Sequence, residues 1–387
     1  MKTIPLFKTY IDNNELKQVK KVLDSGWLTK GKKSSEFEKK IKKLIKSDQV
    51  LSCNSCTNGI FATIIALGLK KGDEVITSPL TFVSTINTLY QLGLKIKLVD
   101  IDIKNYNIDT EKLIKSITKK TKLILVTHYG GYPCEMERII KVCKQRNIKL
   151  IEDAATAFGS KIGKKYIGSF KNSVAVFSFY PNKIITTGEG GIIALNNKEL
   201  AKKLKPILYC GMSKDLLDRK DKKLQYKYEV NSPGYKFNFT DLQAAIGIAQ
   251  LDKFKLILHK RKKVKKNYDY YLREMFDKKI LIKKEVKKKN FSSEYNYTIL
   301  LNDNKLTKYK RDDLIIDLDK MGIKTTVHYI PANFHNFYKK NFSKFDLSNS
   351  NYVYKNIISL PFHSKLSKKD VVYVCTIIKN ILTSKGK

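Results

Sequence analysis

Two short apolar runs enclose a lysine near the middle of the chain, and they constrain the fold more than any other feature. Residues 174–177 and 191–195 are apolar enough to predict buried strands. Lys183 lies in the segment between them, so we expect its amine to be partly desolvated. Desolvation favours a neutral amine, which is a nucleophile towards carbonyl carbon. The alternative is a solvated loop lysine, the common case in a chain with 76 Lys and Arg residues.

A carboxylate upstream makes Lys183 more than one lysine among many. Asp153 follows the strand-like residues 149–152 and precedes Ala154 and Ala155, small residues that let a flat group approach. Pyridoxal phosphate needs two groups from a protein: an amine to join its aldehyde and an anion to keep its pyridine nitrogen protonated. Lys183 and Asp153 therefore predict a pyridoxal phosphate site.

Strand and helix patterns alternate before and around these residues. Strands are predicted at 49–53, 95–100, 122–127 and 149–152. Helices are predicted at 11–25, 35–45, 59–69, 135–146, 198–208, 241–253 and 256–276. Alternation with short turns predicts an α/β fold with a mostly parallel central sheet and helices on both faces. The candidate ligands fall at strand carboxyl ends, where such sheets bind ligands.

The chain divides by pattern into two expected domains. Residues 1–256 would form an N-terminal arm and a large cofactor-binding domain, and residues 257–387 a smaller C-terminal α+β domain. Strands at 295–301 and 324–328 and helices starting at Lys310 and Lys368 are expected in the smaller one. The Lys- and Tyr-rich residues 213–230 are predicted to form a surface loop.

The turn after the first predicted strand offers a phosphate site. Ser55, Cys56 and Thr57 are small or hydroxyl-bearing residues at the start of a helix, where free N–H groups and the helix dipole attract anions. Helix capping alone would also explain Ser55 or Thr57.

Charge and cysteine content limit the classes of function. The net charge of +40 suggests nucleic-acid binding, but the lysines are spread along the whole chain without a basic tail, so no nucleic-acid partner is predicted. No stretch approaches the ~20 apolar residues of a membrane span, which favours a cytoplasmic protein without membrane contact. The six cysteines are expected to be free thiols in the reducing cytoplasm. Cys53 and Cys56 have the spacing of metal ligands, but no second pair of Cys or His stands at a matching distance, so no metal site is predicted.

Three motifs together resemble those of the DegT/DnrJ-type sugar aminotransferases, pyridoxal-phosphate enzymes of fold type I. They are Glu-Asp-Ala-Ala at 152–155, Ser-Phe-Tyr-Pro-Asn-Lys at 178–183 and Gly-Glu-Gly-Gly at 188–191. The resemblance extends over nearly the whole chain. It implies that Lys183 carries the cofactor as a Schiff base and moves the proton, and that Asp153 keeps the ring nitrogen protonated.

The resemblance also assigns the other cofactor residues. Ser55, Cys56, Thr57 and Ser178 would hold the phosphate, and Asn238, or less well Lys236, would reach it from the partner subunit of a homodimer with shared active sites. Many relatives have Arg in place of Asn238. Phe82 would stack on the pyridine ring, although core packing would equally explain a helix aromatic. Thr156 stands where the family usually has His or Gln, and it is shorter.

Five residues fall in family motifs near the substrate: Trp27, Thr29, Tyr180, His328 and Tyr329. A structural role is an equally good account of Trp27, the single tryptophan. The implied activity is amino transfer from L-glutamate to a keto group of a nucleotide-linked sugar, with a UDP- or dTDP-linked 4-keto-6-deoxy sugar as the leading acceptor. Polysaccharide or glycan biosynthesis would use the product. The alternatives are a 3-keto-sugar aminotransferase, a sugar dehydratase of the same family, and a non-catalytic binding or regulatory protein.

Overall fold

A seven-stranded sheet forms the centre of the larger part of the molecule. A computed structural model describes residues 3–212, 227–287, 289–302 and 309–383. In spatial order the strands are β1 (Gln49–Cys53), β9 (Gly191–Leu195), β8 (Val174–Ser178), β5 (Lys149–Asp153), β4 (Thr121–Thr127), β2 (Glu74–Thr77) and β3 (Lys95–Leu98). In this sheet β9 runs in the direction opposite to the other six strands, so the predicted mostly parallel sheet is confirmed.

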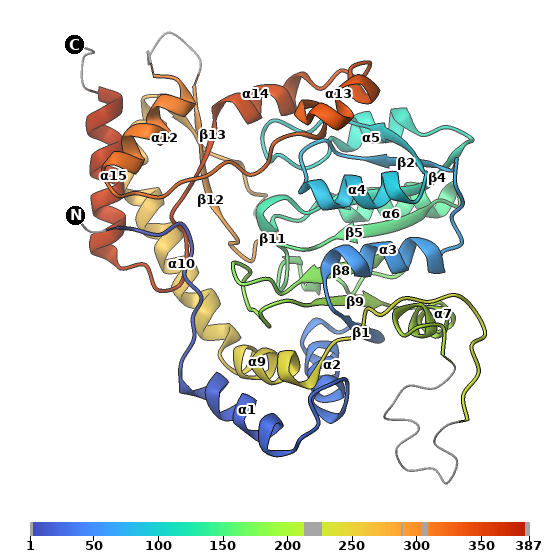
Figure 1. The fold of residues 1–387 in the computed structure, drawn as a ribbon. Coiled ribbons are helices and arrows are strands. Elements are labelled where there is room, and N and C mark those ends of the chain that lie inside the picture. The colour runs from blue at the N-terminus through green and yellow to red at the C-terminus, as the bar shows by residue number, and fades with distance from the viewer. Residues whose placement is uncertain (1–2, 213–226, 288, 303–308, 384–387) are drawn as a thin grey trace.

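Helices cover both faces of this sheet. They are α1 (Asn13–Asp24), α2 (Lys32–Ile45), α3 (Cys56–Ala66), α4 (Val83–Gln91), α5 (Thr110–Ser116), η1 (Tyr129–Gly131), α6 (Met136–Gln145), α7 (Lys198–Leu208) and α9 (Asp241–Asp252). Buried residues of α2, α6 and α9 pack in one core, and those of α3, α4 and α7 in a second (Figure 1). The predicted helix at 59–69 begins earlier, at Cys56.

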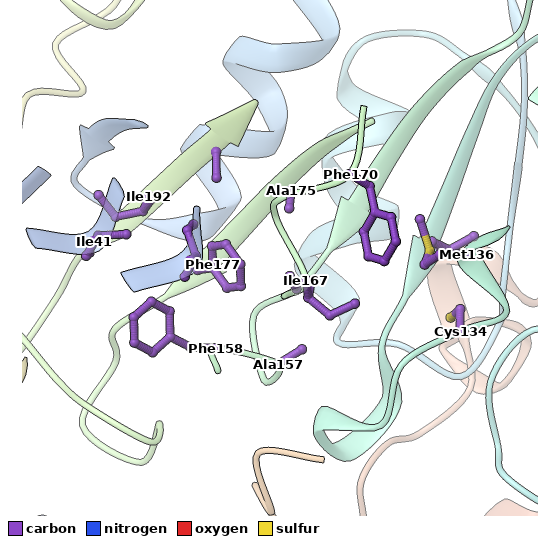
Figure 2. Packing of buried hydrophobic residues seen from close by; sticks show 14 of the residues in the cluster. Ile41, Cys134, Met136, Ala157, Phe158, Ile167, Phe170, Ala175, Phe177 and Ile192 are labelled. Carbon is purple, nitrogen blue, oxygen red and sulfur yellow. The ribbon is translucent and has the colours of Figure 1, made fainter. Parts of the chain in front are cut away.

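The central strands are apolar on both sides because both faces are covered. Along β9, Ile192 faces the α2 side of the sheet and Ile193 the opposite side. Figure 2 shows the first core, where Phe177 of β8 and Ile192 lie near Ile41 of α2 and Phe158. This two-sided burial explains why the sequence shows continuous apolar runs rather than alternation at these strands.

The C-terminal part has a core of its own. A small antiparallel sheet, in the order β10 (Leu281–Ile282), β12 (Tyr297–Leu301) and β13 (Ile357–Leu360), packs with the helices there. These helices are α10 (Phe254–Tyr271), α11 (Arg273–Asp277), α12 (Arg311–Lys320) and α15 (Lys368–Thr383). Three further elements, η2 (Ala332–Phe334), α13 (Asn336–Phe342) and α14 (Ser348–Asn356), have buried residues that pack with residues of the larger part. A third sheet, β11 (Asn290–Phe291), β6 (Lys161–Ile162) and β7 (Lys165–Tyr166), joins segments of both parts.

The N-terminal arm links the two parts. Ile4 bonds through its backbone to Gly322 and Lys324 and packs in the C-terminal core. A few residues later, Thr9 donates its hydroxyl to the carbonyl of Pro181 at 2.9 Å, in the segment that carries Lys183.

Two predicted elements are wrong, and part of a third cannot be compared. Residues 324–328 form no strand, because Lys324 donates its N–H to Ile4 while only Thr326 forms a bridge, to Ser359. The helix expected at 256–276 is broken at Leu272, whose φ of −96° and ψ of 2° leave the helical range. Most of the expected loop at 213–230 lies outside the described residues. Within the described ranges, no helix combines the length and apolar character needed to cross a membrane.

A buried carboxylate joins α9 to the start of α2. The residue before α2 is Gly31, which has no side chain to cap the helix. Asp241, only 4% exposed, replaces the missing cap by accepting hydrogen bonds from the backbone N–H groups of Gly31 and Ser34, each at 2.8 Å, and of Lys33 at 3.1 Å. The Ser34 hydroxyl adds a bond of 2.7 Å. One side chain therefore satisfies the open end of a helix distant in sequence.

We expect Asp241→Ala to lower the free energy of unfolding by about 2 kcal/mol or more, because it leaves several buried donors unpaired. Urea denaturation followed by circular dichroism would measure the change. Asp252→Ala is the matched control, since this aspartate ends the same helix but forms a half-exposed pair with Lys40, and its loss should cost no more than about 1 kcal/mol. Equal effects of the two substitutions would contradict the capping role.

Candidate active site

The candidate residues from several strands meet at one edge of the central sheet. Asp153 ends β5, Ser178 ends β8, and the turn that starts at Asn54 follows β1. Parallel strands bring their carboxyl ends to the same edge. Residues 328–329 of the C-terminal part approach this edge, and the ring of Tyr329 lies 6.0 Å from that of Phe82.

Lys183 lies in a short loop fixed at both ends. Buried Phe179 and Ile184 anchor the loop, and the Lys183 N–H donates to the carbonyl of Tyr180 at 2.9 Å. The side chain is half-buried, as predicted, and its Nζ lies 4.8 Å from the centre of the Tyr295 ring. Tyr295 was missed as a site residue by sequence reasoning, which counted it only as the first residue of the strand expected at 295–301; the strand itself begins at Tyr297.

Asp153 is buried and surrounded by neutral donors. Its Oδ1 accepts the N–H of Ala155 at 3.1 Å, and its Oδ2 accepts the hydroxyl of Thr85 at 2.7 Å, with the Thr81 hydroxyl at 3.5 Å. Both carboxylate oxygens therefore have a hydrogen-bond partner. Thr85 was also missed; its position in the first turn of α4 is the signal that could have found it.

The turn between β1 and α3 presents a helix N-terminus to the site. Ser55 caps the helix, its Oγ accepting the N–H of Asn58 at 3.1 Å, so the capping interpretation applies to this residue. The first N–H groups of α3, those of Cys56 and Thr57, have no intrahelical acceptor. The first residue of β9 is Gly191, where an added Cβ would lie 2.6 Å from the carbonyl carbon of Ser55. Only glycine there lets the turn sit so close to the sheet.

The thiols beside this turn are inert. Burial raises the pKa of Cys53 to about 12 and that of Cys56 well above its ordinary value, with the nearby charge of Asp153 as a second cause for Cys56. The Sγ of Cys56 lies 3.5 Å from the carbonyl oxygen of Val176. Cys56 therefore offers a backbone N–H to the site rather than a nucleophilic sulfur.

Phe82, at the start of α4, and His328, from the C-terminal part, both lie near this edge of the sheet. Phe82 is 57% exposed, so it is not a core residue. Burial lowers the pKa of His328 to about 4, and the neighbouring Lys183 charge acts in the same direction, so the imidazole is neutral at pH 7. Ser359 Oγ lies 2.7 Å from its Nδ1. Tyr129 donates its hydroxyl to the carbonyl of His328.

Thr156 serves the fold of a neighbouring turn. Its hydroxyl donates to the carbonyl of His128 at 2.9 Å and accepts the N–H of Gly131 at 3.1 Å. The hydroxyl proton of Thr156 is therefore bonded within the fold, beside the end of β4. It is not free to donate to the cofactor in the way expected of a residue in the place of His or Gln.

Trp27, Thr29 and Asn238 form a second group. The Trp27 indole donates to the carbonyl of Lys30 at 3.1 Å, and Asn238 Nδ2 lies 3.5 Å from Thr29 Oγ1. Asp241 holds the two segments together through its bonds to the start of α2. Tyr180, in the Lys183 loop, is 46% exposed, and its backbone bonds to both Lys183 and the hydroxyl of Ser178.

The residues at the sheet edge fit pyridoxal phosphate. A half-buried amine, a buried carboxylate with neutral partners, and an uncapped pair of helix N–H groups match its aldehyde, its ring nitrogen and its phosphate respectively. The close approach of Gly191 to the Ser55 turn shapes the floor on which a phosphate would rest.

Comparison with known proteins places the chain in a family. A model of the DegT/DnrJ/EryC1/StrS aminotransferase family matches residues 9–379. The spore coat polysaccharide biosynthesis protein SpsC of Bacillus subtilis is 36% identical over 98% of this chain and 97% of its own length. The Helicobacter pylori PseC structure, an aminotransferase in pseudoaminic acid biosynthesis, is 29% identical with a TM-score of 0.88, covering 99% of this chain and 100% of PseC.

A further solved structure reports on the cofactor. The putative sugar aminotransferase Spr1654 from Streptococcus pneumoniae, in its PMP form, is 27% identical with a TM-score of 0.88, and the match covers 98% of each chain. Together with the motifs and the geometry of the sheet edge, these matches lead to one conclusion. The chain belongs to the DegT/DnrJ/EryC1/StrS family of aminotransferases, enzymes that work with pyridoxal phosphate.

Proposed function

We propose that this aminotransferase moves an amino group from L-glutamate to a keto group of a nucleotide-linked sugar, with a UDP- or dTDP-linked 4-keto-6-deoxy sugar as acceptor. The observation that carries the proposal is the meeting of Lys183, Asp153 and the start of α3 at one sheet edge. The names of SpsC and PseC, which refer to polysaccharide and pseudoaminic acid biosynthesis, support a sugar acceptor.

Each residue of the sheet edge has a separate task in this proposal. Pyridoxal phosphate, when bound, supplies an aldehyde that takes up the amino group and a ring that withdraws electrons from the carbon losing its proton. The amine of Lys183 would hold that aldehyde and, once displaced, move the proton at the α-carbon of the donor. Asp153 would face the ring nitrogen as an anion. The N–H groups of Cys56 and Thr57 would hold the phosphate, together with Ser178.

The facing wall suits the acceptor. Tyr329 would present aromatic surface to the acceptor, and His328, neutral at pH 7, can donate one hydrogen bond from one ring nitrogen while Ser359 bonds to the other. The reaction is proposed to take place in the cytoplasm, where the cysteines, all free and almost all buried, stay reduced.

Incubation of the purified, cofactor-loaded protein with L-glutamate and a panel of nucleotide-linked keto sugars tests the activity. We expect mass spectrometry to find an aminated nucleotide sugar and 2-oxoglutarate in equal amounts. The same sugars without the nucleotide are the matched control and should react far more slowly. Loss of water without amino transfer would indicate a dehydratase, and absence of any turnover across the panel would indicate a binding protein.

Borohydride reduction of the loaded enzyme should fix the cofactor to the peptide that contains Lys183. The rival amine is Lys284, which packs against the rings of Tyr129 and Tyr132 and whose pKa is lowered by burial to about 8. Lys183→Ala should abolish both the label and turnover, whereas Lys284→Ala should retain the label. A label on the peptide of Lys284 would overturn the assignment of Lys183.

A homodimer with shared active sites is the second part of the proposal. Because Asp241 ties the 238–241 segment to the start of α2, Trp27, Thr29 and Asn238 would reach a partner's site as one surface. Apolar side chains lie exposed on α1 and on the turn after it: Leu16 at 70%, Leu23 at 56% and Leu28 at 44%. Such exposed residues next to this surface favour a contact with a second copy.

Subunit mixing tests this arrangement. An inactive Lys183→Ala chain mixed with an Asn238→Ala chain should form heterodimers with one native site and one doubly defective site. If Asn238→Ala alone weakens cofactor binding, activity should then exceed the sum of the two separate variants. No recovery after verified subunit exchange, or an active monomer at assay concentration, would contradict sharing and place Asn238 in its own chain's site.

A further inference from the structure

A line of threonine hydroxyls leads to Asp153 from two other elements. Thr127 ends β4, lies beside Asp153 in the strand register, and contacts the hydroxyl of Thr81 at 3.0 Å. Thr81 in turn contacts Asp153 Oδ2 at 3.5 Å, and Thr85 of α4 donates to the same oxygen at 2.7 Å. All of these hydroxyls are buried, with side chains at most 7% exposed.

These contacts leave the carboxylate with neutral partners alone. Within the described ranges, Asp153 forms no ion pair, and its hydrogen bonds come from hydroxyls and the N–H of Ala155. Donors on both oxygens hold the carboxylate in one orientation. A chain of hydroxyls also polarises each successive donor towards the carboxylate.

The first turn of α4 couples this contact to the cleft. Thr85 N–H donates to the carbonyl of Phe82 at 3.1 Å, and the two residues are three apart, on the same side of the helix. Phe82 is exposed to the cleft while Thr85 is 2% exposed and bonded to Asp153. One helical turn therefore positions both the Phe82 ring, which would stack on the cofactor, and the Thr85 hydroxyl, which donates to Asp153.

We propose that Thr85, supported by Thr81 and Thr127, is a positioning residue that fixes the carboxylate of Asp153 in the orientation in which it meets the cofactor ring nitrogen. The inference rests on the role of Asp153 in the proposed function. Thr85 touches neither substrate nor cofactor and acts through Asp153. Its bond to Oδ2 and the Ala155 bond to Oδ1 together fix the plane of the carboxylate.

Thr85→Val removes the hydroxyl and keeps the shape. We expect kcat to fall about 10- to 100-fold, the range for a lost hydrogen bond to a charged group, with KM for both substrates little changed. The affinity of the cofactor-free protein for pyridoxal phosphate, measured by fluorescence titration, should weaken several-fold. The absorption spectrum of the loaded protein should also change its pH dependence, because the ring nitrogen loses a fixed partner.

Two variants separate positioning from simple loss of packing. Thr85→Ser restores the hydroxyl without the methyl group and should recover most of the activity. Thr88→Val is the matched control one turn further along α4; Thr88 is 1% exposed and its hydroxyl bonds the carbonyl of Ser84 at 2.8 Å. It should keep kcat and cofactor affinity within about twofold of the wild type, since this hydroxyl bonds only to the backbone of its own helix and does not contact Asp153.

Asp153→Asn distinguishes failure of this inference from failure of the proposed function. If Asp153→Asn loses turnover while Thr85→Val matches Thr88→Val, the positioning role is wrong and the function stands. If Asp153→Asn itself is normal, the proposed role of Asp153 is wrong. Should Thr85→Val not fold, Thr85→Ala carries the same expectation, and a Thr85→Ser variant as inactive as Thr85→Ala would overturn the role of the hydroxyl.

Discussion

The parallel pairing of β4, β5 and β8 is the constraint on which the site depends. The register sets Thr127 beside Asp153 and Asp153 beside Val176, so β4 and β5 end level with each other and β8 runs on to Ser178. A slip of one residue would turn Asp153 to the opposite face of the sheet, because side chains alternate along a strand. The hydroxyl contacts, the Lys183 loop after β8 and the helix end after β1 all keep their relation to Asp153 through this sheet.

Glu152, the residue before Asp153, points to the opposite face of the sheet because side chains alternate along a strand. Glu152 is fully buried on the other face, where it accepts the hydroxyl of Ser173 at 2.5 Å and pairs with His128 at 3.0 Å. His128 Nδ1 accepts the N–H of Cys134, so the ring proton lies on Nε2 and points at the carboxylate. Glu152 stabilises the turn after β4, while Asp153 faces the cleft. Two adjacent acidic residues thus have unrelated roles, decided by the face each occupies.

The second core brings residues of the C-terminal part to the sheet edge. Strand β12 follows the residues that bring Tyr295 over Lys183, and β13 carries Ser359, which fixes His328. The N-terminal arm crosses between the parts, with Ile4 in one core and Thr9 on the Lys183 loop. The loop is therefore held from the sheet and from the arm, although its own sequence is short and polar.

The sequence by itself determined the alternating fold, every strand of the central sheet except β2, and the positions of Asp153 at a strand end and Lys183 in a loop between strands, because continuous apolar runs are local signals. It also placed Cys56 and Thr57 at a helix start. Only tertiary structure decided that residues 324–328 form no strand, because Lys324 bonds to Ile4 of the N-terminal arm whereas Thr326 bonds to Ser359. The same holds for Tyr295, Thr85 and Asp241: each acts on a residue distant in the chain, and such a contact arises from packing, which no local pattern of residues encodes.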